Sequence, residues 1–300
     1  MAIRKHPVIF GICLVSLLGL VSILLLHGFR ALTGGSSFSY QGKVGIVDVR
    51  GVIASSQEVV EQLDAFRKDD DIKAVVVRID SPGGGVAASQ EIYSAIKELK
   101  KKKKVVASLG SVGASGGYLI ACAADKIVAN PGTITGSISV IMYFTDAEDL
   151  LKKIGVRASV VKSGKYKDIG SPTREMRPDE KQVLQVLVDD IYHQFIDVVA
   201  ADRKMPEDDV KEIADGRVFT GRQAQTLKLV DDLGDKAAAI QLAGKMAGLK
   251  GLPETVYARK KDITFWDFIL QQSAVSLADI VKEKLPALPR GVNLIYEYGL

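Results

Sequence analysis

One serine of this 300-residue chain stands where a nucleophile is expected. Ser115 lies in "GASGGYLIACAA" (Gly113–Ala124), between small residues and ahead of an apolar, helix-like run. A tight turn between strand and helix exposes a serine hydroxyl, and small neighbours let a substrate backbone approach it. The hydroxyl is a weak nucleophile until a neighbouring base takes its proton. The stretch therefore predicts nucleophilic catalysis, provided that the chain supplies a base.

Histidine, the usual base for a catalytic serine, is scarce in this chain. His6 and His27 flank an apolar N-terminal run, and His193 falls inside a long predicted helix. A serine–histidine–aspartate triad would have to use His193, which lies on a stretch typical of a packing surface. Cys13 and Cys122 form no CxxC motif, and with so few histidines neither a disulfide framework nor a metal site is expected.

A lysine can serve as the base when burial lowers its pKa from about 10.4 by several units. Most lysines here lie on charged surface faces, but "VVKSGKYKDIGSPTREM" (Val160–Met176) leaves a predicted strand at 157–162 and enters a Gly- and Ser-containing loop. It offers Lys162, Lys165 and Lys167. Spacing alone does not choose among the three lysines.

The elements that must position these residues follow an α/β pattern. Apolar runs predict strands at 43–51, 72–80, 104–110 and 125–130, and amphipathic runs predict helices at 56–69, capped by Ser56, at 86–100 and at 113–124. This alternation predicts βαβ units and a mostly parallel sheet. The loops "SPGGG" (Ser81–Gly85) and "GASGG" (Gly113–Gly117) each follow a strand, so both should meet at its carboxyl edge.

Beyond Arg177 the pattern becomes mainly helical. Residues 178–204 predict one long helix opened by Pro178, and residues 215–248 predict a short strand followed by helices. The C-terminal part contains "FWDFILQQSAVSLADIVKEKL" (Phe265–Leu285), a predicted amphipathic helix. That apolar tail could pack on its own body, on a neighbouring subunit or on a membrane surface.

The N-terminal segment predicts a membrane anchor. "VIFGICLVSLLGLVSILLL" (Val8–Leu26) carries no charge, and about 20 such residues in a helix cross a hydrocarbon core. Arg4 and Lys5 precede it, which favours keeping that end in the cytoplasm. No clean small-x-small cleavage site follows, so a retained anchor is favoured over a cleaved signal peptide.

The charge of the chain excludes one class of partner. The net charge is +4, and no basic stripe with interleaved aromatics is present. No nucleic-acid binding is therefore expected. The one dense basic cluster, Lys97–Lys104, falls at a predicted helix end, where cations favour the helix dipole.

Four motifs resemble the signal peptide peptidases of the short, single-repeat SppA type, within the Clp-protease/crotonase-like superfamily. They are "RIDSPGGGVAAS" (Arg78–Ser89), "GASGGYLIACAADKIVANPGTITGSISV" (Gly113–Val140), "KSGKYKDIGSPTREM" (Lys162–Met176) and "DGRVFTGRQAQTLKLVDDLG" (Asp215–Gly234). The resemblance implies an α/β fold, a repeated ββα superhelix with a parallel sheet, plus an N-terminal transmembrane helix and a C-terminal helical extension. The expected division is a membrane anchor at 1–30, a linker at 31–42, a peptidase domain at 43–250 and an extension at 251–300 that is a candidate oligomer interface.

The resemblance also implies the catalytic pair. Ser115 would be the nucleophile and Lys167 the general base, while Ser137 would orient the lysine amine. Asp168, next to the base, would raise the proton affinity of the amine if the two side chains met. In an extended loop the Asp168 side chain should point away from Lys167.

Backbone N–H groups would form the oxyanion hole. The resemblance implies Gly84, with Gly83 as the next choice, together with Gly116. Glycine permits a close approach to a substrate carbonyl, and fixed N–H donors stabilise the oxyanion. No cofactor is implied.

As substrates the resemblance implies apolar peptides such as remnant signal peptides. It further implies a homo-oligomeric ring, held to the cell (inner or cytoplasmic) membrane by one span that contacts lipid, with the catalytic domain on the extracytoplasmic side. A stomatin-operon-type membrane serine protease is the first alternative, although no second uncharged run of about 20 residues follows Leu26. A crotonase-like enzyme acting on a CoA thioester would not need Ser115 or Lys167, and a non-catalytic membrane scaffold of the same fold would not need them either.

Overall fold

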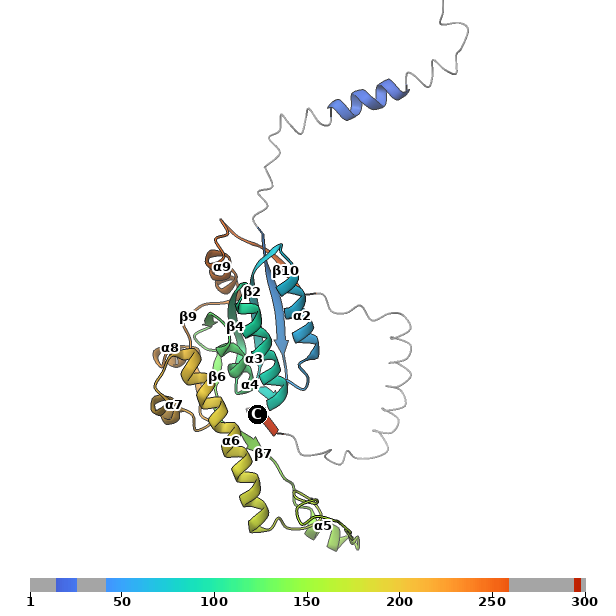
Figure 1. Ribbon diagram of the computed structural model, residues 1–300, viewed down its shortest axis with the longest axis vertical. Helices are drawn as coiled ribbons and strands as arrows, with labels where there is room; N and C mark the ends of the chain where they lie inside the picture. Colours follow the sequence, from blue (N-terminus) through green and yellow to red (C-terminus); the bar gives the residue numbers. More distant parts are fainter. Residues whose placement is uncertain (1–14, 26–41, 259–293, 298–300) are drawn as a thin grey trace, which may run out of the picture. The chain divides into compact units, whose positions relative to one another are not determined.

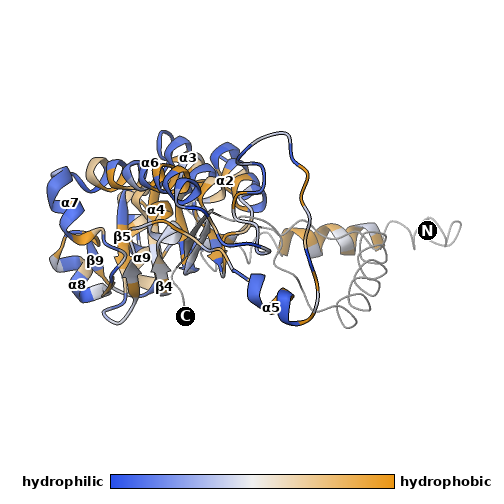
Figure 2. Ribbon diagram, turned by 90° about the horizontal axis from the view of Figure 1, so that it is seen from below, coloured by the Kyte–Doolittle hydropathy of each residue, from blue (hydrophilic) through white to orange (hydrophobic). Residues whose placement is uncertain are grey.

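The computed structural model describes residues 15–25, 42–258 and 294–297. The chain divides into two compact units, Met1–Gln41 and Gly42–Leu300. In the first unit residues 15–25 form a helix whose apolar side chains are exposed, and Figure 2 colours it largely as hydrophobic. Among the described residues no helix combines the length and the apolar character needed to span a membrane.

Two predicted elements fall wholly or partly outside these ranges. Only part of the predicted anchor Val8–Leu26 is described, and the predicted helix Phe265–Leu285 lies outside the described residues, as does most of the linker at 31–42.

The second unit is a mixed α/β structure (Figure 1). Its strands are β1 (Lys43–Arg50), β2 (Ile72–Ser81), β3 (Gly83–Gly85), β4 (Lys104–Ala114), β5 (Lys126–Ala129), β6 (Ile134–Gly136), β7 (Ile141–Met142), β8 (Val218–Thr220), β9 (Asp232–Leu233), β10 (Glu254–Tyr257) and β11 (Leu294–Glu297). Its helices are α2 (Gln57–Lys68), α3 (Val86–Lys100), α4 (Gly116–Cys122), α5 (Glu148–Lys153), α6 (Pro178–Arg203), α7 (Glu207–Ile213), α8 (Gly221–Thr226) and α9 (Lys236–Met246). Strand and helix alternate from β1 to β5 as the sequence predicts, except that β3 follows β2 directly where a loop is predicted.

The main sheet is mostly parallel, which confirms the predicted arrangement. Its strands follow the order β10-β1-β2-β4-β5-β9, and all of these pairs are parallel. Strand β6 pairs with the end of β4, and β8 is added antiparallel to β6. A second, three-stranded sheet has the order β3-β11-β7 and is antiparallel.

Strand β2 shows why this chain forms a buried sheet. Its side chains alternate between two cores: Val75 and Val77 enter the core shared with α2, α3, α4 and α6, while Val76 enters the core beside α9. All three valines are fully buried. Figure 2 shows α2, α3 and α6 together on one side of the strands. A continuous valine-rich run is the pattern expected of a parallel strand covered on both faces.

Two local predictions are wrong. Ser56 does not cap α2, because its backbone is already helical (φ −94°, ψ −24°) and its hydroxyl donates to Glu91 of α3 instead. The strand predicted at 157–162 is absent. Val160 and Val161 are exposed there (55% and 101%), and no neighbouring strand within the described chain supplies the ladder that a strand needs.

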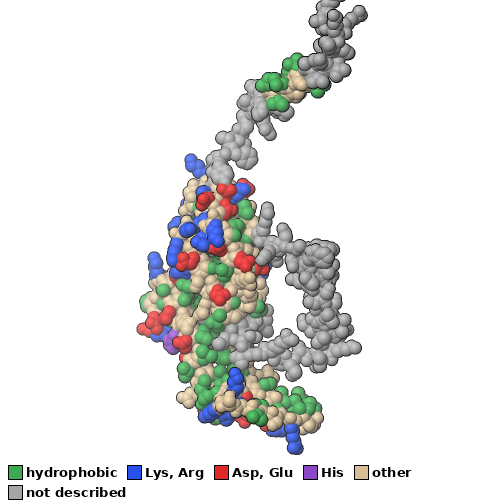
Figure 3. Space-filling model, turned by 45° about the vertical axis from the view of Figure 1, so that its right-hand side comes forward, with side chains coloured by type: hydrophobic (Ala, Val, Ile, Leu, Met, Phe, Trp, Pro, Cys, Tyr) green, Lys and Arg blue, Asp and Glu red, His purple; other side chains and the backbone are tan. Residues whose placement is uncertain are grey.

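The segment 143–177, hereafter the arm, connects β7 to α6. In Figure 1 the arm, with α5 in it, extends away from α4 and the main sheet. None of the α5 residues is buried, and Leu150, Ile154 and Val156 are about half exposed or more. Hydrophobic side chains are visible on this part of the surface in Figure 3. Several exposed apolar side chains on one segment are typical of a protein interface.

Candidate active site

Ser115 occupies a strained turn between β4 and α4. Its backbone has φ 51° and ψ −120°, a conformation that non-glycine residues rarely adopt. The turn is fixed because the Ser115 N–H donates to the carbonyl of Gly136 (2.8 Å) and its carbonyl accepts from Leu119 (2.9 Å). This strand–turn–helix geometry is the one that presents a nucleophilic serine at the edge of an α/β sheet.

The two glycine-rich loops meet at this edge, as predicted. Strands β2 and β4 are parallel neighbours, and Ser81 is paired with Gly113. The sequence reading missed the role of Ser81, which is fully buried. Its hydroxyl donates to the carbonyl of Gly51 (2.6 Å) and accepts from the N–H of Gly83 (3.1 Å). That hydrogen bond occupies the Gly83 donor, so Gly84 is better placed than Gly83 to serve an oxyanion.

Strand β3 fixes the direction of the Gly84 donor. The Ile53 N–H donates to Gly83 and the Gly85 N–H donates to Ile53 (both 2.8 Å). Because peptide groups alternate along a strand, the N–H of Gly84 points to the side opposite Ile53. Gly84 itself has φ +157°, and a Cβ there would lie 2.5 Å from the Ile53 nitrogen. Gly116 begins α4, where helical N–H groups have no intrahelical acceptor.

Ser137 lies beside the nucleophile. It follows β6, whose Gly136 is paired with Ala114 at the end of β4. It is 6% exposed, has φ 50°, and donates its N–H to the carbonyl of Arg217 (2.9 Å). The structure thus brings together Ser115, Ser137 and the glycine donors.

A strand from the C-terminal part of the chain pairs with β3, beside the Ser115 turn. Strand β11 pairs antiparallel with β3 on one side and with β7 on the other. Tyr296 lies opposite Gly84, and Ile295 lies opposite both Gly85 and Ile141. Figure 1 shows this short red strand next to β7, and β11 also contacts α4. The side of β3 that carries the Gly84 donor therefore accepts an extended backbone. The sequence reading placed the tail beyond the α/β core and gave no register for it.

Lys167 is not brought to Ser115 within one chain. Ser115 is 1% exposed in the body, whereas Lys167 is exposed on the arm. No hydrogen bond joins the two side chains among the described residues. The predicted strand at 157–162, which was expected to carry the lysine loop to the sheet edge, does not form.

The structure separates the three candidate lysines by their partners. Lys162 is ion-paired with Asp168, and Lys165 is ion-paired with Asp179 at 2.8 Å. The Asp179 hydrogen bond raises the pKa of Lys165. The Lys167 amine has no carboxylate partner among the residues that the structure describes. A lysine that acts as a base must be free of such a partner, which distinguishes Lys167 from the other two.

The Asp168 carboxylate is bonded to residues other than Lys167, in a loop that is a series of turns rather than extended. The Arg174 guanidinium donates to the Asp168 carboxylate (3.0 Å), and Lys162 pairs with its other oxygen. Arg174, followed by Lys162, holds the pKa of Asp168 well below its ordinary value. His193 lies exposed on α6, with its ring nitrogen 2.6 Å from the Asp189 carbonyl of its own helix.

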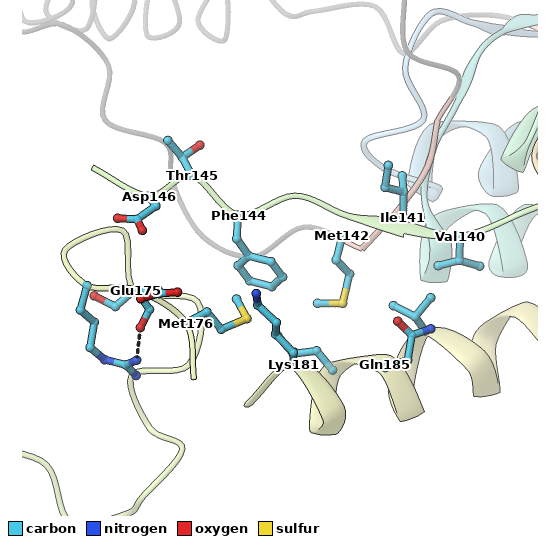
Figure 4. Close-up of a pocket in the computed structure, with 14 residues that line it drawn as sticks. Val140, Ile141, Met142, Phe144, Thr145, Asp146, Glu175, Met176, Lys181 and Gln185 are labelled. Atoms are coloured by element: carbon cyan, nitrogen blue, oxygen red, sulfur yellow. Dashed lines mark hydrogen bonds between the residues drawn. The ribbon is translucent and has the colours of Figure 1, made fainter. Parts of the chain in front are cut away.

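A cavity of about 730 Å³ adjoins β7 at the base of the arm. Figure 4 shows Met142 and Phe144 on one side of it, and Met176, Lys181 and Gln185 on the other. Apolar side chains and polar or charged side chains contribute equally to its lining, so the cavity can receive an apolar group beside charged residues.

The parallel sheet, the serine turn and the facing glycine strand define an α/β serine peptidase of the Clp-protease kind. A Clp protease family model matches residues 45–133, and the model of peptidase family S49 matches residues 97–250. The chain belongs to peptidase family S49. It is a serine peptidase, and the resemblance to SppA is confirmed.

Relatives carrying protease names are found in several organisms. A protein of Synechocystis named as a protease is 50% identical over 213 residues, which cover 70% of this chain and 76% of that protein. The SppA signal peptide peptidase named in Enterococcus faecium is 36% identical over 74% of this chain and 68% of its own length. The chloroplastic serine protease SPPA of Arabidopsis thaliana is 36% identical over 68% of this chain, but this match spans 30% of that protein.

Proposed function

We propose that this peptidase is a membrane-anchored endopeptidase that cleaves apolar peptides, remnant signal peptides among them, with a Ser115/Lys167 dyad. The observation that carries the proposal is the strained Ser115 turn beside a glycine strand on which an extended backbone, β11, is already paired. A nucleophile and backbone donors next to a strand-binding groove are the parts needed for cleaving peptides.

The mechanism follows from these groups. The neutral amine of Lys167 takes the Ser115 proton as the oxygen attacks the peptide carbonyl. The N–H groups of Gly84 and Gly116 hold the resulting oxyanion. The tetrahedral intermediate collapses to an acyl-serine, and the leaving amine takes the proton from the lysine. Lys167 then removes a proton from water, which attacks the acyl group. The bond to the Ser115 oxygen breaks, that oxygen takes the proton back from Lys167, and the second product is released as a carboxylic acid.

The substrate binds as an added β-strand in the position of β11. Pairing with β3 and β7 uses main-chain hydrogen bonds, which do not depend on the peptide sequence. Selectivity then comes from pockets beside the strand. The cavity next to β7 has Met142, Phe144 and Met176 in its wall, which favours apolar side chains.

The dyad is completed between two copies of the chain. Lys167 lies on the arm, which carries exposed apolar side chains and extends away from α4. An arm that docks head-to-tail on the next copy generates a closed ring when the rotation closes. Each ring interface would bury the arm and place the Lys167 of one copy at the Ser115 of its neighbour.

The N-terminal segment holds this ring on the cell (inner or cytoplasmic) membrane. The apolar run Val8–Leu26 is long enough for one span, and in the described helix 15–25 the leucines are exposed. The basic residues Arg4 and Lys5 place the catalytic domain on the extracytoplasmic side. Apolar peptides left in the bilayer would then lie close to the site.

The proposed binding of substrate in the position of β11 is tested with the full chain in detergent micelles. The substrates are two fluorogenic peptides of equal length, one apolar and one polar. The apolar peptide should be cleaved preferentially. Tyr296→Pro should lower the KM for the apolar peptide several-fold with kcat unchanged, because proline lacks the N–H that strand pairing needs and so releases the groove. Tyr296→Ala, the matched control, keeps the backbone and should change KM less. Equal cleavage of both peptides, or an unchanged KM in Tyr296→Pro, would contradict this account of substrate binding.

A further inference from the structure

The loop that carries Lys167 is anchored to α6 by a buried carboxylate. Glu180 lies in the first turn of α6 and is fully buried. Its two oxygens accept a pair of hydrogen bonds from the Arg174 guanidinium, at 2.6 and 2.8 Å. Glu180 also accepts the N–H of Arg177, at 2.9 Å. A bidentate arginine–carboxylate pair fixes direction as well as distance.

The same guanidinium reaches the residue next to the base. Arg174 donates its Nε–H to the Asp168 carboxylate (3.0 Å) and an Nη–H to the Asp168 carbonyl (3.1 Å). Arg174 therefore bridges α6 to the backbone and side chain adjoining Lys167. Helix α6 in turn buries Phe195 and Ile196 in the main core. The position of the loop is therefore fixed relative to the core of its own subunit.

We propose that Arg174, held on Glu180, is a positioning residue for the Ser–Lys reaction: it fixes the loop that presents Lys167 and keeps the Asp168 carboxylate from pairing with the lysine amine. The proposal rests on the dyad proposed above. Without Arg174 the carboxylate beside the base regains a free oxygen, and the loop loses its tie to α6.

Most charged side chains around the Lys167 loop are paired with residues other than Lys167. Lys162 pairs with the second oxygen of Asp168, and Lys165 pairs with Asp179 of α6. Glu148 of α5 pairs with Lys152 and accepts the N–H of Glu175. Lys181 of α6 lines the adjoining cavity. Within the described chain, Asp168 is the carboxylate that follows Lys167 directly in the sequence, and its partners are Arg174 and Lys162.

The two carboxylates that Arg174 contacts, Asp168 and Glu180, stay ionised at neutral and alkaline pH. Arg174 lowers the pKa of Glu180 from 4.5 to about 2. A carboxylate whose pKa is lower in the folded state contributes stability that is complete above its unfolded value, near 4.5, and is lost as the pH falls toward 2. Above about pH 6 the Glu180 and Asp168 carboxylates both stay ionised, so neither of them adds a step to the alkaline pH profile.

The test is the pH dependence of kcat and KM for an apolar peptide, measured on the full chain with Arg174→Met. The kcat should fall about 10- to 100-fold, because a misplacement of about 1 Å costs that much. The midpoint of the alkaline rise should move up by about 1 pH unit, because a carboxylate stabilises the protonated amine; the KM is measured alongside because Arg174 also lines the cavity beside β7. Adding Asp168→Asn should return the midpoint to the wild-type value while kcat stays low.

Arg177→Met is the matched control, since Arg177 also pairs with Glu180 but does not touch Asp168; its midpoint should stay at the wild-type value. A wild-type kcat and midpoint in Arg174→Met would overturn the proposal. If Arg174→Met does not assemble, Arg174→Lys is used instead, because lysine keeps the positive charge but cannot make the bidentate pair with Glu180. A wild-type kcat in Arg174→Lys would then overturn the proposal. An active Lys167→Met would instead show that the dyad is wrong, so the two failures are distinguishable.

Discussion

Replacing Ser115 by alanine, or Lys167 by methionine, should lower kcat/KM on an apolar peptide by about 10⁴- to 10⁶-fold, as expected when either half of a nucleophile–base unit is lost. Ser115→Ala removes the attacking oxygen from a turn that the fold builds with a strained backbone. Lys167→Met keeps the length of the side chain and removes the amine. In the wild type the rate should rise toward alkaline pH, because only the neutral amine accepts the proton.

Two controls separate this account from its competitors. Lys165→Met should lose at most a few-fold, because Lys165 is engaged with Asp179. His193→Ala should retain full activity, because His193 is exposed on α6 and bonds within its own helix. An active Lys167→Met together with an inactive His193→Ala would point to a histidine-based triad. A fluorophosphonate that labels Ser115 in the wild type would separate a peptidase from a scaffold or a thioester hydratase.

The second large effect is expected at Gly84. Gly84→Ala should lower kcat about 10²- to 10³-fold, the usual cost of losing one oxyanion donor. A methyl group there meets the Ile53 backbone at 2.5 Å, so β3 must shift and carry its N–H away from the oxyanion. Gly85→Ala is the matched control, because its Cβ would lie 3.4 Å from the Ile53 carbonyl oxygen. Equal, small effects in both variants would remove Gly84 from the oxyanion hole.

The parts of the site that follow from local pattern could be predicted from the sequence. Strand β2 is a run of valines because both faces of the sheet are covered. The turn at Ser115 follows from a strand, small residues and a helix in succession. The meeting of the Ser81–Gly85 and Gly113–Gly117 loops follows from the rule that parallel strands end at one edge. Local residues carried all of this information.

The parts that depend on distant contacts could not be predicted. Gly83–Gly85 reads as a loop because glycine is disfavoured in strands, yet it forms β3 because the Ile53 backbone approaches so closely. The pairing of β11 with β3 joins residues about 200 positions apart. Arg174 looks like an ordinary loop arginine until Glu180 and Asp168 are placed around it.

The position of Lys167 is the largest difference between expectation and structure. The sequence placed the lysine loop at the sheet edge through a strand at 157–162, and that strand does not form within the described chain. Its residues lie on the arm, where Val161 is fully exposed. In the assembly proposed above, the arm packs on a second copy, and contacts between copies cannot be deduced from the pattern of one chain.

The most direct measurement uses two inactive variants together. Ser115→Ala and Lys167→Met are co-expressed with different tags, and assemblies that carry both tags are purified and assayed on an apolar peptide. If each site takes its serine from one copy and its lysine from the next, random mixing leaves about a quarter of the sites intact, because each half is present with a probability of about one half. The account predicts that recovery, of about a quarter of the wild-type activity. Doubly tagged assemblies without activity would show that both residues must come from the same chain.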